Sequence, residues 1–114
     1  RLLPPNGVYT ARVTVLGEPR KLQPPAIVAP RTGPVYGAML NLGMRPTVGG
    51  TQLRCEAHLF DFSGDLYGQE VQVELLAPMR PERTFPSLEA LVAQLREDER
   101  AARAFLARWT EARP

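Results

Sequence analysis

The chain has 114 residues, of which 44% are hydrophobic and 23% charged, with a formal net charge of +2, as is typical of one soluble globular domain. No apolar run approaches the roughly 20 residues of a membrane helix, and the basic residues are scattered rather than gathered in one stripe, so we expect neither a membrane nor a nucleic-acid partner. The single cysteine excludes an internal disulfide and favours a reducing, cytoplasmic location, and with only one histidine a classical zinc site is almost excluded.

The N-terminal half of the chain predicts strands separated by a proline-rich loop. Residues 7–16 alternate between apolar and polar side chains and are rich in β-branched residues, which indicates a strand. Residues 17–34 contain five prolines and predict a loop, with at most a short edge strand at 26–28. Residues 35–42 predict the second strand.

The next segment predicts a loop followed by a hairpin. Proline and a glycine pair punctuate residues 43–50, which we expect to form the loop. Residues 53–62 and 70–76 then predict two strands joined around 63–65. On the first of these strands the Cys55 side is apolar and should face the core, so the opposite side, with Glu56, should face solvent or a cleft.

An amphipathic helix is expected at the end of the chain. Ser87 is a plausible N-cap, and from Leu88 to Trp109 apolar residues recur at steps of three and four. Strands followed by one such helix predict an antiparallel β-barrel with a helix packed across it.

Glu56 is the first candidate for chemistry. Phosphoryl transfer to an alcohol needs a carboxylate that accepts the hydroxyl proton, and a mid-strand position holds that group rigidly. The alternative is that Glu56 belongs to the hydrated face of an antiparallel sheet, as is common. His58 points the same way and is an acid–base partner of Glu56, half of a metal site with it, or a surface histidine.

Two further side chains could bind a ligand. Arg80 follows a strand and could grip a phosphate or a carbonyl group, or it could form a structural ion pair with Glu82 or a helix acid. Tyr67 could stack on a planar ligand or simply pack in its loop. Cys55, on the apolar side of its strand, is expected to be a buried core residue rather than a nucleophile.

The order of these features resembles the riboflavin kinase module of bacteria, often the C-terminal half of a bifunctional enzyme that makes FMN and then FAD. The resemblance covers residues 3–103. It is carried by Gly-Val-Tyr at 7–9, Asn-Leu-Gly-Met-Arg-Pro-Thr at 41–47, Glu56 with His58 and Leu59, Asp-Leu-Tyr-Gly at 65–68, Arg-Pro-Glu at 80–82, Phe85, Ser87, Leu88, Leu91 and Asp98. It implies a mainly β fold, a six-stranded antiparallel Greek-key barrel with one C-terminal amphipathic helix, over residues 1–114.

The resemblance also implies the activity and the site. Riboflavin and ATP would be the substrates, FMN the product, and Glu56 the catalytic base on the ribityl 5′-hydroxyl. The flavin would be bound by Arg80, Glu82, Phe85 and Tyr67. The nucleotide and a mobile flap would involve Asn41, Gly43, Arg45, Thr47 and His58. An adenylyltransferase domain is expected on the N-terminal side.

One motif of the family is missing. Its members place Pro-Thr-Ala-Asn ahead of the Gly-Val-Tyr strand, where Thr and Asn hold Mg²⁺ and the ATP phosphates, and this chain contains no such motif. We therefore expect the Mg²⁺ ligands mostly outside this chain, the first strand to be lacking, and kinase activity to be impaired. The alternatives are a non-catalytic flavin- or nucleotide-binding barrel and a protein-interaction module.

Overall fold

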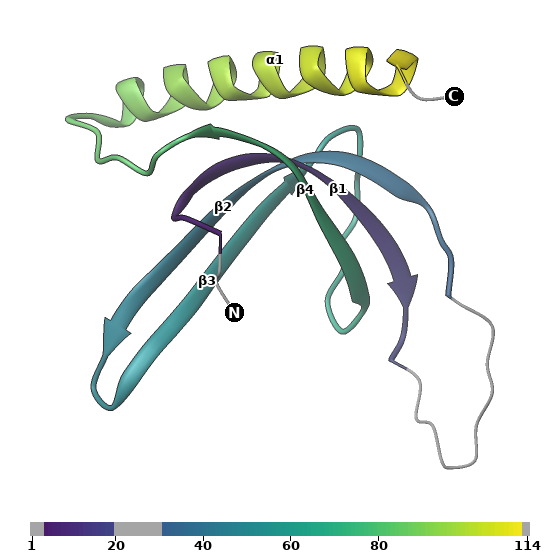
Figure 1. The fold of residues 1–114 in the computed structure, drawn as a ribbon, viewed down its shortest axis with the longest axis horizontal. Helices are drawn as coiled ribbons and strands as arrows, with labels where there is room; N and C mark the ends of the chain where they lie inside the picture. The colour runs from purple at the N-terminus through teal and green to yellow at the C-terminus, as the bar shows by residue number, and fades with distance from the viewer. Residues whose placement is uncertain (1–3, 20–30, 113–114) are drawn as a thin grey trace.

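The computed structural model describes residues 4–19 and 31–112, which form one antiparallel sheet and one helix (Figure 1). The elements in chain order are β1 (Gly7–Gly17), β2 (Val35–Thr47), β3 (Gly50–Leu59), β4 (Glu70–Arg80) and α1 (Leu88–Ala112). The strand order across the sheet is β3-β2-β1-β4, so β1 and β2 are central and β3 and β4 lie at the two edges.

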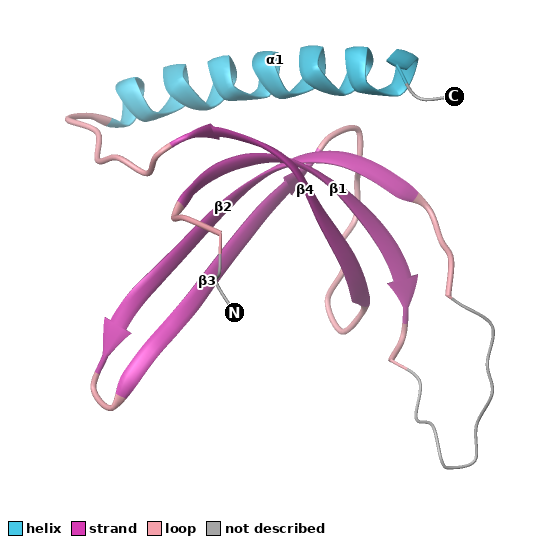
Figure 2. Cartoon of the chain, in the orientation of Figure 1, coloured by secondary structure: helices cyan, strands magenta, loops and turns pink. Residues whose placement is uncertain are grey.

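The sheet is arched, and α1 runs along one side of it as a separate layer (Figure 2). On the other side, alternate residues of the central strands build the apolar core, because side chains two positions apart share a face. This core contains Tyr9, Ala11, Val13, Ala38, Leu40 and Leu42, with Leu59 and Leu75 packed against it.

The helix packs on the opposite face through small residues and long side chains. Gly37 leaves room for Leu106, whose Cδ1 atom would lie 2.5 Å from a Cβ at position 37. The Arg12 guanidinium stacks over the Trp109 ring at 5.0 Å. Thr10 is buried although its position alternates with the core residues, because α1 covers its face of the sheet.

The mainly β fold, the strand near residues 7–16 and the C-terminal helix are confirmed. Ser87 caps α1: its hydroxyl oxygen accepts a hydrogen bond from the Ala90 backbone N–H at 3.1 Å. The described residues contain four strands where six were expected, and β3 and β4 are not paired with each other. The short strand expected at 26–28 lies outside the described residues.

Two predictions about the middle of the chain are wrong. Residues 43–47 continue β2 rather than forming a loop, and only Val48 and Gly49 connect it to β3. Gly49 has φ +88, which favours glycine and allows this two-residue connection. As a result β3 pairs with β2, and the expected hairpin between 53–62 and 70–76 does not form, since β4 pairs with β1.

The expected burial of Cys55 is also wrong. Because β3 is an edge strand, both of its faces are largely open, and Cys55 is exposed. Nearby residues of the same chain still bury the thiol in part, and this desolvation raises the pKa of Cys55 above its usual value. Within the described part of the chain, no helix combines the length and apolar character needed to span a membrane.

Candidate active site

One row of side chains crosses all four strands on the face that α1 covers. The strand register places Glu56 opposite Asn41, Asn41 opposite Val8, and Val8 opposite Arg80. With neighbouring strands about 4.8 Å apart, the two ends of the row are separated by about 14 Å along the sheet. A second row runs from His58 through Met39 and Thr10 to Ala77, two residues along β1, β2 and β3 and three along β4, where the register shifts.

A cavity of about 340 Å³ lies over the first row, between the sheet and the start of α1. Its size falls within the range of small-molecule sites, and its lining mixes apolar and charged side chains as such sites do. The lining residues are Val8, Met39, Leu40, Asn41, Glu56, Ala57, His58, Arg80, Glu82, Arg83, Phe85, Leu91 and Leu95. Six of the ten residues expected from the sequence to form the site are therefore brought together: Asn41, Glu56, His58, Arg80, Glu82 and Phe85.

Glu56 projects from the middle of β3 at one end of the cavity. Its side chain is 70% exposed, and the Arg54 guanidinium lies 4.0 Å from its carboxylate, too far for a hydrogen bond. The strand therefore fixes the Glu56 backbone, while its carboxylate is exposed and only loosely paired with Arg54. His58 shares its face, and its ring meets Phe60 edge to face at 5.7 Å.

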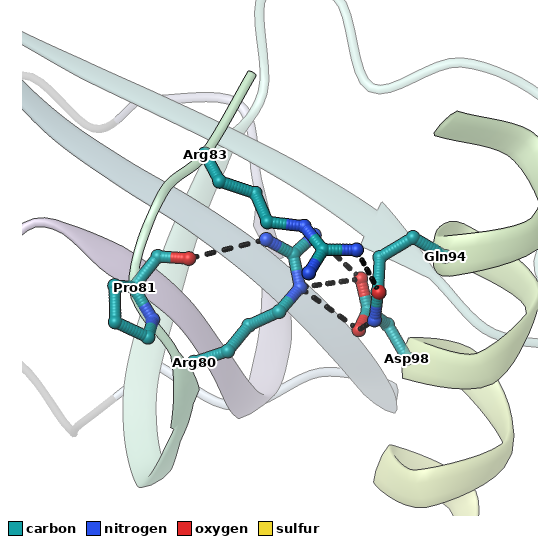
Figure 3. Close-up of polar contacts among 5 residues, drawn as sticks. All are labelled: Arg80, Pro81, Arg83, Gln94 and Asp98. Atoms are coloured by element: carbon teal, nitrogen blue, oxygen red, sulfur yellow. Dashed lines mark hydrogen bonds and ion pairs between the residues drawn. The ribbon is translucent and has the colours of Figure 1, made fainter. Parts of the chain in front are cut away.

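Arg80 stands at the other end of the row and is tied to the helix (Figure 3). Its Nε donates to both oxygens of Asp98 at 3.0 and 3.1 Å, and its Nη2 donates to Oδ2 at 2.7 Å. Its Nη1 donates to the carbonyl oxygen of Pro81 at 3.2 Å. The alternative of an ion pair with a helix acid is therefore realised, and Arg80 anchors the end of β4 to α1.

Asp98 is the buried half of this pair, with 4% of its surface exposed. It also accepts a hydrogen bond from the Gln94 side-chain amide at 2.8 Å. Burial by itself raises the pKa of the Asp98 carboxyl, but the hydrogen bonds from Arg80 and Gln94 outweigh that effect and hold the pKa below its usual value. The carboxylate therefore keeps its charge and fixes the Arg80 side chain.

Arg83 and Gln94 were missed by the sequence reasoning. Arg83 donates to the Gln94 side-chain oxygen (Figure 3). Its guanidinium also stacks on the Phe85 ring at 4.8 Å. The available signal was spacing: Gln94 precedes Asp98 by four residues and so lies on the same face of α1. Arg83 and Phe85 together give the cavity a flat aromatic and cationic wall.

At the edge of the cavity, Glu82 meets two residues of β2 that the sequence analysis assigned to a flap. Its carboxylate lies 3.8 Å from the Arg45 guanidinium. A Cβ at position 43 would lie 3.2 Å from both of its oxygens, so Gly43 allows this close approach to β2. Gly43 and Arg45 are thus beside the cavity although they do not line it.

Thr47 and Tyr67 lie away from the cavity. Thr47 is exposed at the end of β2, where it pairs with Gly50. Tyr67 is 93% exposed in the β3–β4 connection, where its backbone N–H donates to Asp65 Oδ1 at 3.1 Å. Their roles in binding a ligand stay predictions. Over residues 4–19 and 31–112, no three or more His, Cys, Asp or Glu side chains gather where they could hold a metal ion.

The chain is similar to known proteins over most of its length. The family model described as Flavokinase: Riboflavin kinase matches residues 1–106. The chain is 35% identical over 102 residues to a bifunctional riboflavin kinase/FMN adenylyltransferase of Haemophilus influenzae, covering 90% of this chain and 28% of that protein. It is 40% identical over 102 residues to the enzyme of the same name from Escherichia coli K12, with the same coverage.

A solved structure also resembles the chain. It is a crystal structure of a macrolide-efflux protein from Streptococcus pneumoniae, with a TM-score of 0.72 and 31% sequence identity. The match covers 90% of this chain and 28% of that one. The chain therefore spans little more than a quarter of the length of these relatives.

Proposed function

Since the chain belongs to the riboflavin kinase family, we propose that it transfers the γ-phosphate of ATP to the 5′-hydroxyl of riboflavin and so forms FMN. The observation that carries this proposal is the position of Glu56: an exposed carboxylate on a strand, at one end of a cavity whose other end offers a flat aromatic wall. A flavin has the matching shape, a planar ring joined to a flexible polyol chain.

Glu56 is proposed as the general base. The terminal hydroxyl of the polyol chain becomes a better nucleophile as its proton passes to the carboxylate, while the oxygen forms its bond to the γ-phosphorus and the bond to ADP breaks. Because β3 fixes the Glu56 backbone, the base needs little reorganisation when the substrate arrives. His58, on the same face, is proposed to lie beside the phosphates.

The isoalloxazine ring is proposed to lie at the opposite end, near Phe85, Arg83 and the first turns of α1. Support comes from the apolar side chains there, Leu91 and Leu95, and from the arginine–aromatic stack, which presents a planar surface. The Arg80–Asp98 pair holds this wall to the sheet. We therefore propose that Arg80 positions the residues of the flavin site by joining β4 to α1. Glu82 completes the rim.

ATP is proposed to approach from the side of the β2–β3 hairpin. Arg45 is more than half exposed, and its ion pair with Glu82 is long, so its guanidinium is available to phosphate oxygens. We propose that Mg²⁺ arrives with the ATP phosphates, as is usual for this ion, which binds few protein ligands. We further propose that the domain works beside an FMN adenylyltransferase domain, because the relatives' names pair the two activities.

The test is ATP-dependent formation of FMN by the purified protein, followed by separation of riboflavin and FMN and by transfer of label from the γ-phosphate. Appearance of labelled FMN supports the proposal. Quenching of riboflavin fluorescence without any FMN, at saturating ATP and Mg²⁺, would instead favour a non-catalytic flavin-binding barrel. Absence of both binding and turnover would overturn the proposal.

A further inference from the structure

Gln94 lies on α1 between two charged side chains and is hydrogen-bonded to both of them (Figure 3). Its oxygen Oε1 accepts a hydrogen bond from Arg83 Nη2, and its nitrogen Nε2 donates to Asp98 Oδ1 at 2.8 Å. The two partners fix the orientation of the amide, because a guanidinium only donates and a carboxylate only accepts. A flipped amide would lose both hydrogen bonds, so Gln94 has one favoured position between Arg83 and Asp98.

Asp98 is the fixed end of this Arg83–Gln94–Asp98 network. It is 4% exposed and is held by Arg80 as well as by Gln94. Gln94 itself is half-buried and is not one of the residues that line the cavity of the candidate active site. Any effect of Gln94 on a bound ligand must therefore pass through a neighbour.

Arg83 is the end of the network that meets the cavity. It lies in the connection between β4 and α1, its side chain is exposed, and it lines the cavity together with Phe85. An exposed arginine can adopt many rotamers, and a ligand that binds against it must immobilise it. The hydrogen bond to Gln94 holds the Arg83 guanidinium at 4.8 Å from the centre of the Phe85 ring before any ligand arrives.

We propose that Gln94 is a positioning residue for flavin binding: anchored by Asp98, it holds Arg83 against Phe85, so that the surface for the isoalloxazine ring is already formed in the free protein. The inference rests on the proposed function and deepens it, because it states how affinity for the ring is obtained. Preorganisation increases affinity by reducing the entropy that is lost on binding. Glu56 stands at the opposite end of the cavity, so the chemical step should not depend on Gln94.

A purely structural role for Gln94 would require Asp98 to depend on it, yet the Asp98 carboxylate has other donors. Its Oδ1 also accepts from Arg80 Nε at 3.0 Å, and its Oδ2 accepts from Arg80 Nη2 at 2.7 Å. Gln94→Met keeps the length of the side chain and removes the amide, and it leaves no buried charge unpaired. We expect its melting temperature to fall by less than about 8 °C, the effect of one hydrogen bond in a domain of this size.

The experiment measures the binding of two flavins by fluorescence titration. Riboflavin carries the polyol chain, whereas lumiflavin has the same ring system without it. For Gln94→Met we expect the dissociation constants of both flavins to rise by the same factor, about three- to tenfold, because one long side chain must then be ordered on binding. At saturating riboflavin, kcat for FMN formation should stay within about twofold of the wild-type value, since only ground-state binding is lost. Gln72→Met, which removes an exposed amide from β4, is the matched control and should change neither affinity.

A double-mutant cycle tests whether Gln94 acts through Arg83. Arg83→Met removes the side chain that Gln94 positions, so the double variant Arg83→Met with Gln94→Met should bind riboflavin as tightly as Arg83→Met alone. Additive losses would overturn the inference, because Gln94 would then affect the flavin by another route. Unchanged affinity in Gln94→Met, or a loss for riboflavin but not for lumiflavin, would also overturn it.

Failure of the proposed function is seen separately. If the wild-type protein bound both flavins but formed no labelled FMN, phosphate transfer would be refuted, and the binding comparison would still decide the role of Gln94. If the wild-type protein bound neither flavin, the proposed function and the inference would fall together.

Discussion

Glu56 and Arg80 stand at opposite ends of a single row of side chains that crosses the sheet, although 23 positions separate them in the chain and their strands form its two edges. Asn41 and Val8 lie between them. The two ends of the cavity therefore differ: one has an exposed carboxylate, and the other has an arginine held by a buried aspartate. The proposed transfer of phosphate uses the first end for chemistry and the second for positioning.

The first prediction concerns the proposed base. Glu56→Gln keeps the size and polarity of the side chain but cannot accept the hydroxyl proton, so we expect kcat for FMN formation to fall by roughly 10²–10⁴ with riboflavin affinity nearly unchanged. Glu74→Gln is the matched control, because Glu74 is a half-exposed carboxylate on β4 that pairs with Arg12. Wild-type turnover in Glu56→Gln would remove Glu56 from the mechanism.

The second prediction concerns the close approach of β1 and β4. A Cβ at position 7 would lie 2.7 Å from the Arg80 carbonyl oxygen, and Gly7 has φ +156. Because a backbone atom cannot rotate away, Gly7→Ala should lower the free energy of unfolding by about 1–3 kcal/mol and weaken riboflavin binding by displacing Arg80. Gly50→Ala, where a Cβ would meet no atom within 4 Å, should change neither. Equal denaturation midpoints for the two variants would contradict this reasoning.

The period of two along a strand was enough to predict one wall of the site. It placed Glu56 and His58 on the same face, and both line the cavity. It could not decide which strands are neighbours. A plausible hairpin between 53–62 and 70–76 competed with the actual pairing of β3 to β2, and the row from Glu56 to Arg80 exists only in the actual pairing.

Burial at the sheet edge and contacts to the helix were also beyond the sequence pattern. Alternation on β3 predicted a buried Cys55, but this edge strand is exposed from Gly50 to His58, and only Leu59 at its end packs against the core. Arg80 could be assigned to a ligand or to a helix acid from the sequence, and only the placement of α1 brings Asp98 to it.

The third prediction tests the Arg80–Asp98 pair as an anchor between β4 and α1. Asp98 is 4% exposed and Arg80 17%, so removing one partner leaves a buried charge unpaired. We expect Arg80→Met to lower the free energy of unfolding by about 3 kcal/mol, and the double variant Arg80→Met with Asp98→Leu to recover a large part of that loss. Urea denaturation of the two single variants and the double variant measures the coupling. Strictly additive effects would show that the pair does not act as a unit.

The fourth prediction is the response of stability to acid. The Asp98 pKa is lowered in the folded protein, so the folded state binds the proton less readily than the unfolded chain does, whose aspartate pKa is about 3.9. The resulting stabilisation is complete above that value and is lost as the pH falls through the lower, folded-state pKa. The free energy of unfolding, from urea titrations between about pH 6 and pH 2, should therefore fall less steeply in Asp98→Asn than in the wild-type protein.

Asp61→Asn is the control. Hydrogen bonds from Arg103 also lower the pKa of Asp61, but this carboxylate lies at a fully exposed site where solvent screens the pair. We therefore expect a smaller change in the pH dependence for Asp61→Asn. Parallel curves for Asp98→Asn and the wild-type protein would show that Asp98 does not contribute in this way.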